Sequence, residues 1–232
     1  MNKSFQKTTP LTIEDWQLTD YQVAFDRQTA MVEKRLADQQ GDTLIFVEHP
    51  NSVTLGRRAT PSDLHFPENY FAERGIKLQK INRGGLATAH EPGQLVVYPI
   101  IRLKTKNLHW FADTFLNIVI TLLADYGVDG YLKEGEPGVW VHNRKICSFG
   151  IALKKWVSCH GLALNMNNNL ETFSTIVPCG RPGEVVTSLS RELGHHIDLD
   201  EAKRRFTELF CASFAYQIKP DVKGEKYALS QS

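Results

Sequence analysis

The stretch Arg83-Gly84-Gly85-Leu86-Ala87-Thr88-Ala89-His90-Glu91-Pro92-Gly93-Gln94-Leu95-Val96-Val97-Tyr98-Pro99 joins a glycine-rich loop to a short apolar run. The two glycines after Arg83 permit backbone conformations that a Cβ would block, and they let the main chain approach a ligand closely. The run from Leu95 to Tyr98 predicts a buried strand that ends at Pro99. With Arg83 and His90 facing the same space, the stretch predicts one wall of a binding pocket. A tight hairpin without a ligand is the alternative interpretation.

A chain of 232 residues is long enough to bury a full core, so residues 1–219 are predicted to form one domain and residues 220–232 a mobile polar tail. The formal net charge is +1, so the total charge shows no polyanion-binding character and no nucleic-acid partner is expected. Residues 1–16 lack the apolar core of a signal peptide, and no stretch approaches the roughly 20 apolar residues that cross a bilayer. The chain is therefore expected to be soluble and cytoplasmic, without a membrane partner.

Apolar periodicity divides the chain into helices and strands. Helices are predicted over 16–39 and 110–126 and from Asp198 onward, where Glu201 three residues later has the spacing of a capping box. Residues 59–75, rich in Pro, Asp and Asn, are predicted to form a surface excursion. Strands are predicted over 43–48, 52–55, 77–82, 95–98, 139–141, 145–153 and 157–165. This order favours the α+β class, with helices packed on sheet.

The four cysteines match no zinc-binding or C-x-x-C spacing, so they are expected to be thiols. Cys179 has the setting of a nucleophile, because Pro178 fixes φ before it and Gly180 allows a sharp turn after it. A packed loop cysteine is the alternative interpretation. Cys159 adjoins His160, but neighbours in a strand point to opposite faces, so the two are not expected to form a dyad. The other three cysteines are predicted to be structural: Cys147, Cys159 and Cys211.

A cysteine nucleophile acts as its thiolate, so a neighbouring group must lower its pKa. The sequence offers two candidates for that group, His90 and Lys145. Lys145 begins an otherwise apolar strand, and an ammonium held close to a thiol stabilises the thiolate. A solvated lysine at the start of a strand is the alternative interpretation. The sequence contains no Ser-His-Asp spacing, Walker loop, paired carboxylates or metal-ligand spacing, so no metal is expected.

Several sequence blocks, taken in order, resemble the octanoyltransferases of lipoate biosynthesis, which belong to the biotin/lipoate protein ligase fold group. The resemblance runs from Leu44 to Leu189, and it rests on the order of the blocks because each one alone is a weak signal. The blocks are Arg83-Gly84-Gly85 with Thr88, His90 and Pro92-Gly93-Gln94; Pro137-Gly138-Val139-Trp140; Lys145-Ile146-x-Ser148-x-Gly150; His160-Gly161-Leu162-Ala163-Leu164-Asn165; Ile176-x-Pro178-Cys179-Gly180; and Val186-Thr187-Ser188-Leu189.

The resemblance implies an enzyme that moves an octanoyl group from acyl carrier protein to a lysine of lipoyl domains. The implied acceptors are the lipoyl domains of 2-oxo-acid dehydrogenase complexes and the H protein of the glycine cleavage system. Cys179 would carry the acyl group as a thioester and Lys145 would tune that thiol, with no cofactor or nucleotide. The implied fold is a single domain of two packed β-sheets flanked by helices around an acyl pocket. The implied substrate-binding residues are Arg83, Gly84, Gly85, Leu86, Ala87, Thr88, Ala89, His90, Ser148, Phe149, Gly150, Gly161, Leu162 and Ala163.

Two alternatives share parts of this pattern. An adenylating lipoate–protein ligase would have the same fold, but such enzymes lack the Pro-Cys-Gly cysteine and the Pro-Gly-Gln after the histidine. A non-catalytic acyl-binding module is the second alternative, and Glu91 makes it conceivable.

The chain also departs from the family pattern within the first block. The family usually has Gly at position 91 and Gln-Val-Thr-Tyr in place of Leu86-Ala87-Thr88-Ala89, which puts pocket shape and chain-length preference in question. Because an unpaired buried carboxylate is costly, Glu91 is predicted to lie at the pocket rim, near solvent or a basic neighbour such as Lys145 or Arg83.

Overall fold

A computed structural model describes residues 9–177 and 185–219, and its organising element is an eight-stranded sheet. The strand order is β11-β1-β2-β6-β10-β9-β8-β7, and a second sheet has the order β4-β3-β5. The strands of the large sheet are β1 (Thr9–Leu18), β2 (Asp42–Glu48), β6 (Gln94–Ile100), β7 (Tyr131–Lys133), β8 (Glu136–Val141), β9 (Arg144–Lys154), β10 (Val157–Asn165) and β11 (Tyr216–Ile218). The small sheet holds β3 (Ser52–Leu55), β4 (Lys77–Lys80) and β5 (Ala87–His90).

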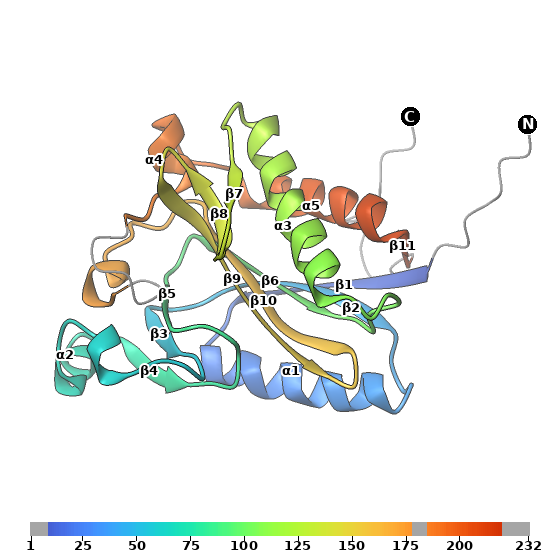
Figure 1. Cartoon of the computed structure of the whole chain (residues 1–232), viewed down its shortest axis with the longest axis horizontal. Coiled ribbons are helices and arrows are strands. Elements are labelled where there is room, and N and C mark those ends of the chain that lie inside the picture. Colours follow the sequence, from blue (N-terminus) through green and yellow to red (C-terminus); the bar gives the residue numbers. More distant parts are fainter. Residues whose placement is uncertain (1–8, 178–184, 220–232) are drawn as a thin grey trace, which may run out of the picture.

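Helices cover both faces of the large sheet (Figure 1). On one face lie α3 (Leu108–Asp125) and α5 (Leu199–Phe214), and on the other lies α1 (Tyr21–Leu36). Smaller elements complete the chain: α2 (Glu68–Glu73), α4 (Leu189–Leu193) and the 3₁₀ turns η1 (Pro61–Asp63) and η2 (Thr172–Thr175). The predicted architecture, an α+β domain with two sheets and flanking helices, is confirmed.

The central strand β6 is apolar at successive positions because both of its faces are buried. Leu95 and Val97 pack into the core under α3 and α5, whereas Val96 and Tyr98 pack into the core under α1. A strand covered on both faces needs apolar side chains at every position. The strand does not end at Pro99 as predicted, because Pro99 pairs with β2 beyond the last β6–β10 pair.

Two tight hairpins join β8, β9 and β10. Their two-residue turns, His142-Asn143 and Lys155-Trp156, all have positive φ between 46° and 66°. Two consecutive left-handed residues form the turn whose twist matches paired strands, so the three predicted strands fold as a meander.

The predicted helix over 110–126 is confirmed as α3, and seven of its side chains are buried. Within the described ranges, one helix, α3, has the length and apolar composition of a membrane span. Its buried apolar side chains lie in the core.

The predictions of the first helix and of the surface excursion are partly wrong. Residues 16–18 belong to β1, and the helix begins at Tyr21 after its cap, Asp20. The strand forms because β1 pairs in parallel with β2 and with β11, which are distant in sequence. Residues 59–75 contain α2, whose Phe71 is fully buried beneath the small sheet. The predicted tail, residues 220–232, lies outside the described residues.

Candidate active site

A buried chain of hydrogen bonds connects the small sheet to the large sheet. The Arg83 guanidinium donates to the Thr54 hydroxyl at 2.9 Å, and this hydroxyl lies 3.4 Å from Nε2 of His90. Nδ1 of His90 lies 2.8 Å from Oε1 of Gln94, whose amide nitrogen donates to Oδ1 of Asn165 at 2.9 Å. The amide nitrogen of Gln94 donates to the Ala89 carbonyl and to Asn165. The amide oxygen of Gln94 therefore accepts the Nδ1–H of His90. His90 is therefore held as the neutral tautomer with an unprotonated Nε2.

Burial keeps the histidines of this region neutral. It lowers the pKa of His49 and of His160 to about 4, and it lowers the pKa of His90 well below its ordinary value. Nδ1 of His49 lies 2.7 Å from the Thr19 carbonyl, so it donates, and Nε2 accepts the Tyr98 hydroxyl at 2.8 Å. A neutral His90 offers no positive charge to a nearby thiol. Of the two residues expected to tune a cysteine, Lys145 is therefore the remaining candidate.

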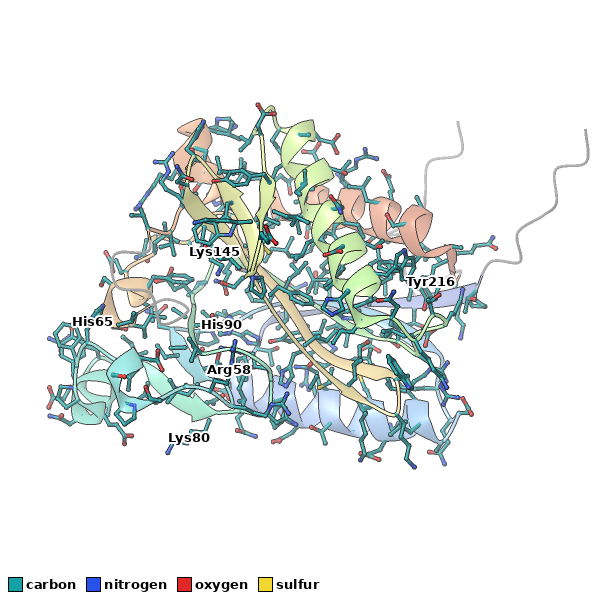
Figure 2. All side chains as sticks on the ribbon, in the orientation of Figure 1. Arg58, His65, Lys80, His90, Lys145 and Tyr216 are labelled. Atoms are coloured by element: carbon teal, nitrogen blue, oxygen red, sulfur yellow. The ribbon has the colours of Figure 1, made fainter. Side chains whose placement is uncertain are left out.

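The cavity beside this network lies between the two sheets and the start of α1. Its volume is about 30 Å³, room for about two water molecules. An acyl chain of several carbons can therefore enter only if side chains along the wall move. Nine predicted substrate-binding residues line it: Arg83, Thr88, His90, Ser148, Phe149, Gly150, Gly161, Leu162 and Ala163. Figure 2 places His90 at the level where the two sheets meet, with Lys145 above it in the large sheet.

The remaining five predicted binding residues do not line the cavity. Gly84, Gly85 and Leu86 lie in the loop before β5. Ala87 and Ala89 are buried instead in the core between the small sheet and η2, because alternate residues of a strand point to opposite faces. The departures from the family pattern at these two positions therefore alter that core rather than the cavity wall.

Four cavity-lining residues were not among the predicted substrate-binding residues: Tyr21, Val96, Tyr98 and His160. Tyr98 belongs to the apolar run, where strand alternation could have placed it on the same face as Val96. Tyr21 begins α1, and its ring centroid lies 5.2 Å from that of His90. That contact joins residues far apart in sequence, and no local signal identifies it.

Lys145 is buried near the start of β9, three residues before the cavity-lining Ser148. Its Nζ lies 5.1 Å from the ring centroid of Trp140. Its backbone N–H donates to the Val185 carbonyl at 2.8 Å, and its carbonyl accepts from the N–H of Thr187 at 2.9 Å. The alternative of a solvated lysine is wrong, because only 3% of Lys145 is exposed. The segment that follows residues 178–184 is thus paired directly with Lys145.

Three cysteines lie in the described part of the chain, and all three are free thiols. Burial raises the pKa of Cys147 to about 12 and the pKa values of Cys159 and Cys211 to about 11. Such thiols hold very little thiolate at neutral pH, which agrees with the predicted structural role. Cys179, the predicted nucleophile, lies outside the described residues.

Cys159 and His160 form no dyad, although not for the predicted reason. His160 has a φ of +63°, so strand alternation is interrupted there. The two side chains have separate partners. The Cys159 sulfur lies 3.6 Å from Oε1 of Gln28, and Nε2 of His160 lies 2.7 Å from Oδ1 of Asn82.

Glu91 is not at the rim, and that prediction is wrong. Glu91 is 2% exposed, and its side chain accepts three hydrogen bonds from the start of η2 and the loop before it. The donors are the Asn168 amide at 2.9 Å, the Leu170 N–H at 2.9 Å and the Thr172 N–H. A buried carboxylate becomes acceptable when fixed donors replace water. These N–H groups take the place of the cationic neighbour that was expected.

The chain matches the model of the lipoyl protein ligase A/B catalytic domain over residues 20–211. It belongs to this family. It is 43% identical to an octanoyltransferase of Nitratidesulfovibrio vulgaris, covering 75% of this chain and 82% of that protein. It is 37% identical to an octanoyltransferase of Caldicellulosiruptor saccharolyticus, covering 89% and 92% of the two chains. This member of the lipoyl protein ligase A/B family is therefore an acyltransferase, as the sequence blocks predicted.

Solved structures of the family share the fold at low identity. A lipoate–protein ligase A bound with ATP matches with a TM-score of 0.73 and 16% identity, covering 95% of this chain and 91% of that one. A bi-partite lipoate protein ligase from Thermoplasma acidophilum, described with its E2 lipoyl domain, matches with a TM-score of 0.71 and 17% identity, covering 95% and 89%. At this identity the likeness establishes the fold alone.

Proposed function

We propose that this acyltransferase moves an octanoyl group from acyl carrier protein to a specific lysine of lipoyl domains, through a thioester on Cys179 and without ATP. The octanoyl group is the one named for the relatives at 43% and 37% identity. The acceptors would be the lipoyl domains of 2-oxo-acid dehydrogenase complexes and the glycine cleavage H protein. The reaction would take place in the cytoplasm.

The observation that carries the proposal is the position of Lys145. Its buried side chain lies on the strand that continues into the cavity wall at Ser148, and its backbone pairs with Val185 and Thr187. Cys179 precedes Val185 by six residues in the chain. A cation with little access to water stabilises a thiolate more strongly than an exposed one, because screening is weaker.

The reaction follows as two exchanges on one sulfur. The Cys179 thiolate attacks the carbonyl carbon of the donor thioester, and the carrier sulfur leaves with the electron pair of the broken bond and takes up a proton. The neutral amine of the acceptor lysine then attacks the acyl-enzyme, the Cys179 sulfur leaves as thiolate, and the nitrogen loses a proton. One thioester replaces another in the first exchange, and the more stable amide drives the second. Neither exchange needs nucleotide energy.

The proposal is tested by intact-mass measurement after mixing the protein with octanoyl-acyl carrier protein. One octanoyl group should appear on the peptide that contains Cys179, and it should move to a lipoyl domain in nucleotide-free buffer. Cys179→Ala should abolish both events. Lys145→Ala should shift the alkylation of Cys179 to higher pH, toward the value of about 8.5 typical of a free thiol. Lys145 would also assist the attacking amine, so Lys145→Arg should rescue transfer to the lipoyl domain only in part, because a guanidinium does not give up its proton near neutral pH.

Three outcomes would count against the proposal. An octanoyl adduct that survives Cys179→Ala would exclude this cysteine as the carrier. Exchange of pyrophosphate into ATP that depends on octanoate would identify an adenylating ligase instead. The absence of any acyl-enzyme from a folded protein with an intact Cys179 would favour a non-catalytic acyl-binding module.

A further inference from the structure

A second cavity, here called the β3–α2 groove, lies against the outer side of the Arg83–Gly85 loop. Its volume is about 460 Å³, within the range of roughly 300–1,000 Å³ typical of ligand pockets. It is walled by the end of β3 and the loop that follows it, the start of α2 and the end of β4. Six of its lining residues carry the argument: Leu55, Gly56, Arg57, Leu64, Phe66 and Lys80.

One wall of the groove packs against the loop that contributes Arg83 to the acyl cavity, the cavity beside His90 described above. The N–H of Gly56 donates to the Leu86 carbonyl at 3.1 Å, and the N–H of Arg57 donates to the Arg83 carbonyl at 3.1 Å. A Cβ on Gly56 would lie 2.5 Å from the Gly85 carbonyl oxygen, so the two segments pack backbone against backbone. The side chain of Arg83 lines the acyl cavity on the other side. A molecule in the groove is therefore separated from the acyl cavity by two packed segments, residues 55–57 and residues 83–86.

The opposite wall is bonded to the segment that leads to Cys179. Leu64 forms an antiparallel bridge with Ile176, and the N–H of Val177 donates to the Asp63 carbonyl at 2.9 Å. Val177 is two residues before Cys179 in the chain. The groove thus lies between the wall of the acyl cavity and the residues that precede the proposed nucleophile.

The groove combines cations with apolar surface. Arg57 and Lys80 line it, Arg58 is exposed beside Arg57, and among residues 9–177 and 185–219 no ion pair engages any of the three. Glu68 is the carboxylate in the lining. Figure 2 shows Arg58 and Lys80 on the side of the molecule that holds the small sheet. The excess of positive charge favours an anionic ligand, and the aromatic and aliphatic lining favours a ligand with an apolar middle.

We propose that this groove holds the 4′-phosphopantetheine arm of the donor carrier, an inference that rests on the proposed function. The arm is an extended chain with the thioester sulfur at one end, a phosphate at the other, and amides and a dimethyl group between them. Arg57 and Lys80 bind the phosphate through charge-assisted hydrogen bonds. Leu64 and Phe66 pack against the dimethyl group. The arm would thereby direct the thioester toward the loop that holds Arg83, whose side chain lines the acyl cavity.

Direct binding tests the groove without catalysis. Isothermal titration in phosphate-free buffer with free 4′-phosphopantetheine should show binding that Arg57→Ala/Lys80→Ala weakens at least tenfold. Pantetheine, which lacks the phosphate, should bind weakly and equally to both proteins. Lys106→Ala is the matched control, because it removes an exposed cation from the loop before α3 and should leave binding unchanged. Circular dichroism should verify that each variant is folded.

Acylation kinetics test whether the groove serves the donor. The Arg57→Ala/Lys80→Ala variant should lose at least tenfold in kcat/KM for acyl-enzyme formation from octanoyl-carrier. It should keep its rate with octanoyl-N-acetylcysteamine, a truncated thioester that ends before the phosphate. A loss that appears with octanoyl-coenzyme A but not with octanoyl-carrier would assign the groove to coenzyme A and overturn the carrier assignment.

The groove and the proposed function fail in different ways. Equal rates for variant and parent on all donors, with no titratable binding of 4′-phosphopantetheine, overturn the groove while acyl transfer stands. An equal loss on full-length and truncated donors also overturns it, because the two cations would then act on the reacting centre. Binding that depends on Arg57 and Lys80 in a protein that forms no acyl-enzyme supports the groove and overturns the transfer mechanism.

Discussion

The carboxylate of Glu91 accepts the backbone N–H of Leu170 at 2.9 Å, and Leu170 adopts a φ of +70°. A left-handed conformation is uncommon for a bulky residue and persists only where surrounding contacts hold it. The Glu91 carboxylate also accepts the Thr172 N–H, which begins η2. The turn η2 leads to Ile176 and Val177, so Glu91 fixes the shape of the chain before the Cys179 segment.

We therefore expect Glu91→Gly to lower the free energy of unfolding by about 2–5 kcal/mol, since buried donors left without an acceptor cost about 1–3 kcal/mol each and the loop relaxes in part. Glu91→Gln keeps one acceptor oxygen and should lose about half as much. Urea titration measures both, and Glu73→Gln, at an exposed position, is the control. If Glu91→Gly unfolds at the same urea concentration as the parent, the three hydrogen bonds do not hold the loop.

The three described cysteines should resist alkylation in the folded protein. Because burial raises the pKa of Cys147 to about 12 and of Cys159 and Cys211 to about 11, thiolate is scarce at pH 7.5. Iodoacetamide should modify these three residues only after unfolding in guanidinium chloride, as peptide mass spectrometry would show. Rapid labelling of any of them in the native state would contradict the assigned burial.

Protonation of the buried histidines should destabilise the protein in mild acid. The pKa of His49 is about 4 in the folded state and about 6.5 when unfolded, so between these values the unfolded chain binds more protons. Stability should therefore fall as the pH is lowered from about 6.5 toward 4, by up to about 1.4 kcal/mol per pH unit for each such histidine. Urea unfolding at several pH values measures the slope. His49→Gln should reduce it, and the exposed His65→Gln should not. Equal slopes for the parent and His49→Gln would contradict this assignment.

Two glycines predicted to bind substrate should tolerate alanine very differently. A Cβ at Gly161 would lie 2.0 Å from the Val97 carbonyl oxygen within the sheet, so Gly161→Ala must separate β10 from β6. At Gly84 the nearest atom to a Cβ is 3.8 Å away, an ordinary contact. Gly161→Ala should cost about 3 kcal/mol and Gly84→Ala less than about 0.5 kcal/mol, as measured by thermal unfolding. Similar melting temperatures for the two variants would show that the sheet yields at Gly161.

The sequence by itself determined the features that depend on local pattern. Strand alternation and turn residues predicted β9 and β10, because a two-residue hairpin and its flanking strands are set by neighbours in the chain. The apolar stripe of α3 predicted a buried helix for the same reason. The position of Lys145, a lone lysine in an apolar strand, made it a candidate to tune a cysteine.

Only the tertiary structure decided the features that join distant segments. β1 is a strand because β2 and β11 offer it parallel partners, and no local pattern carries that information. Glu91 is buried rather than exposed because a loop nearly 80 residues later supplies its donors. Tyr21 reaches the cavity beside His90 because α1 packs across the sheet face that holds Tyr98. In each case the partners come from segments that are distant in the chain and meet only when the protein folds. The sequence around the residue therefore does not show whether it will be paired or buried.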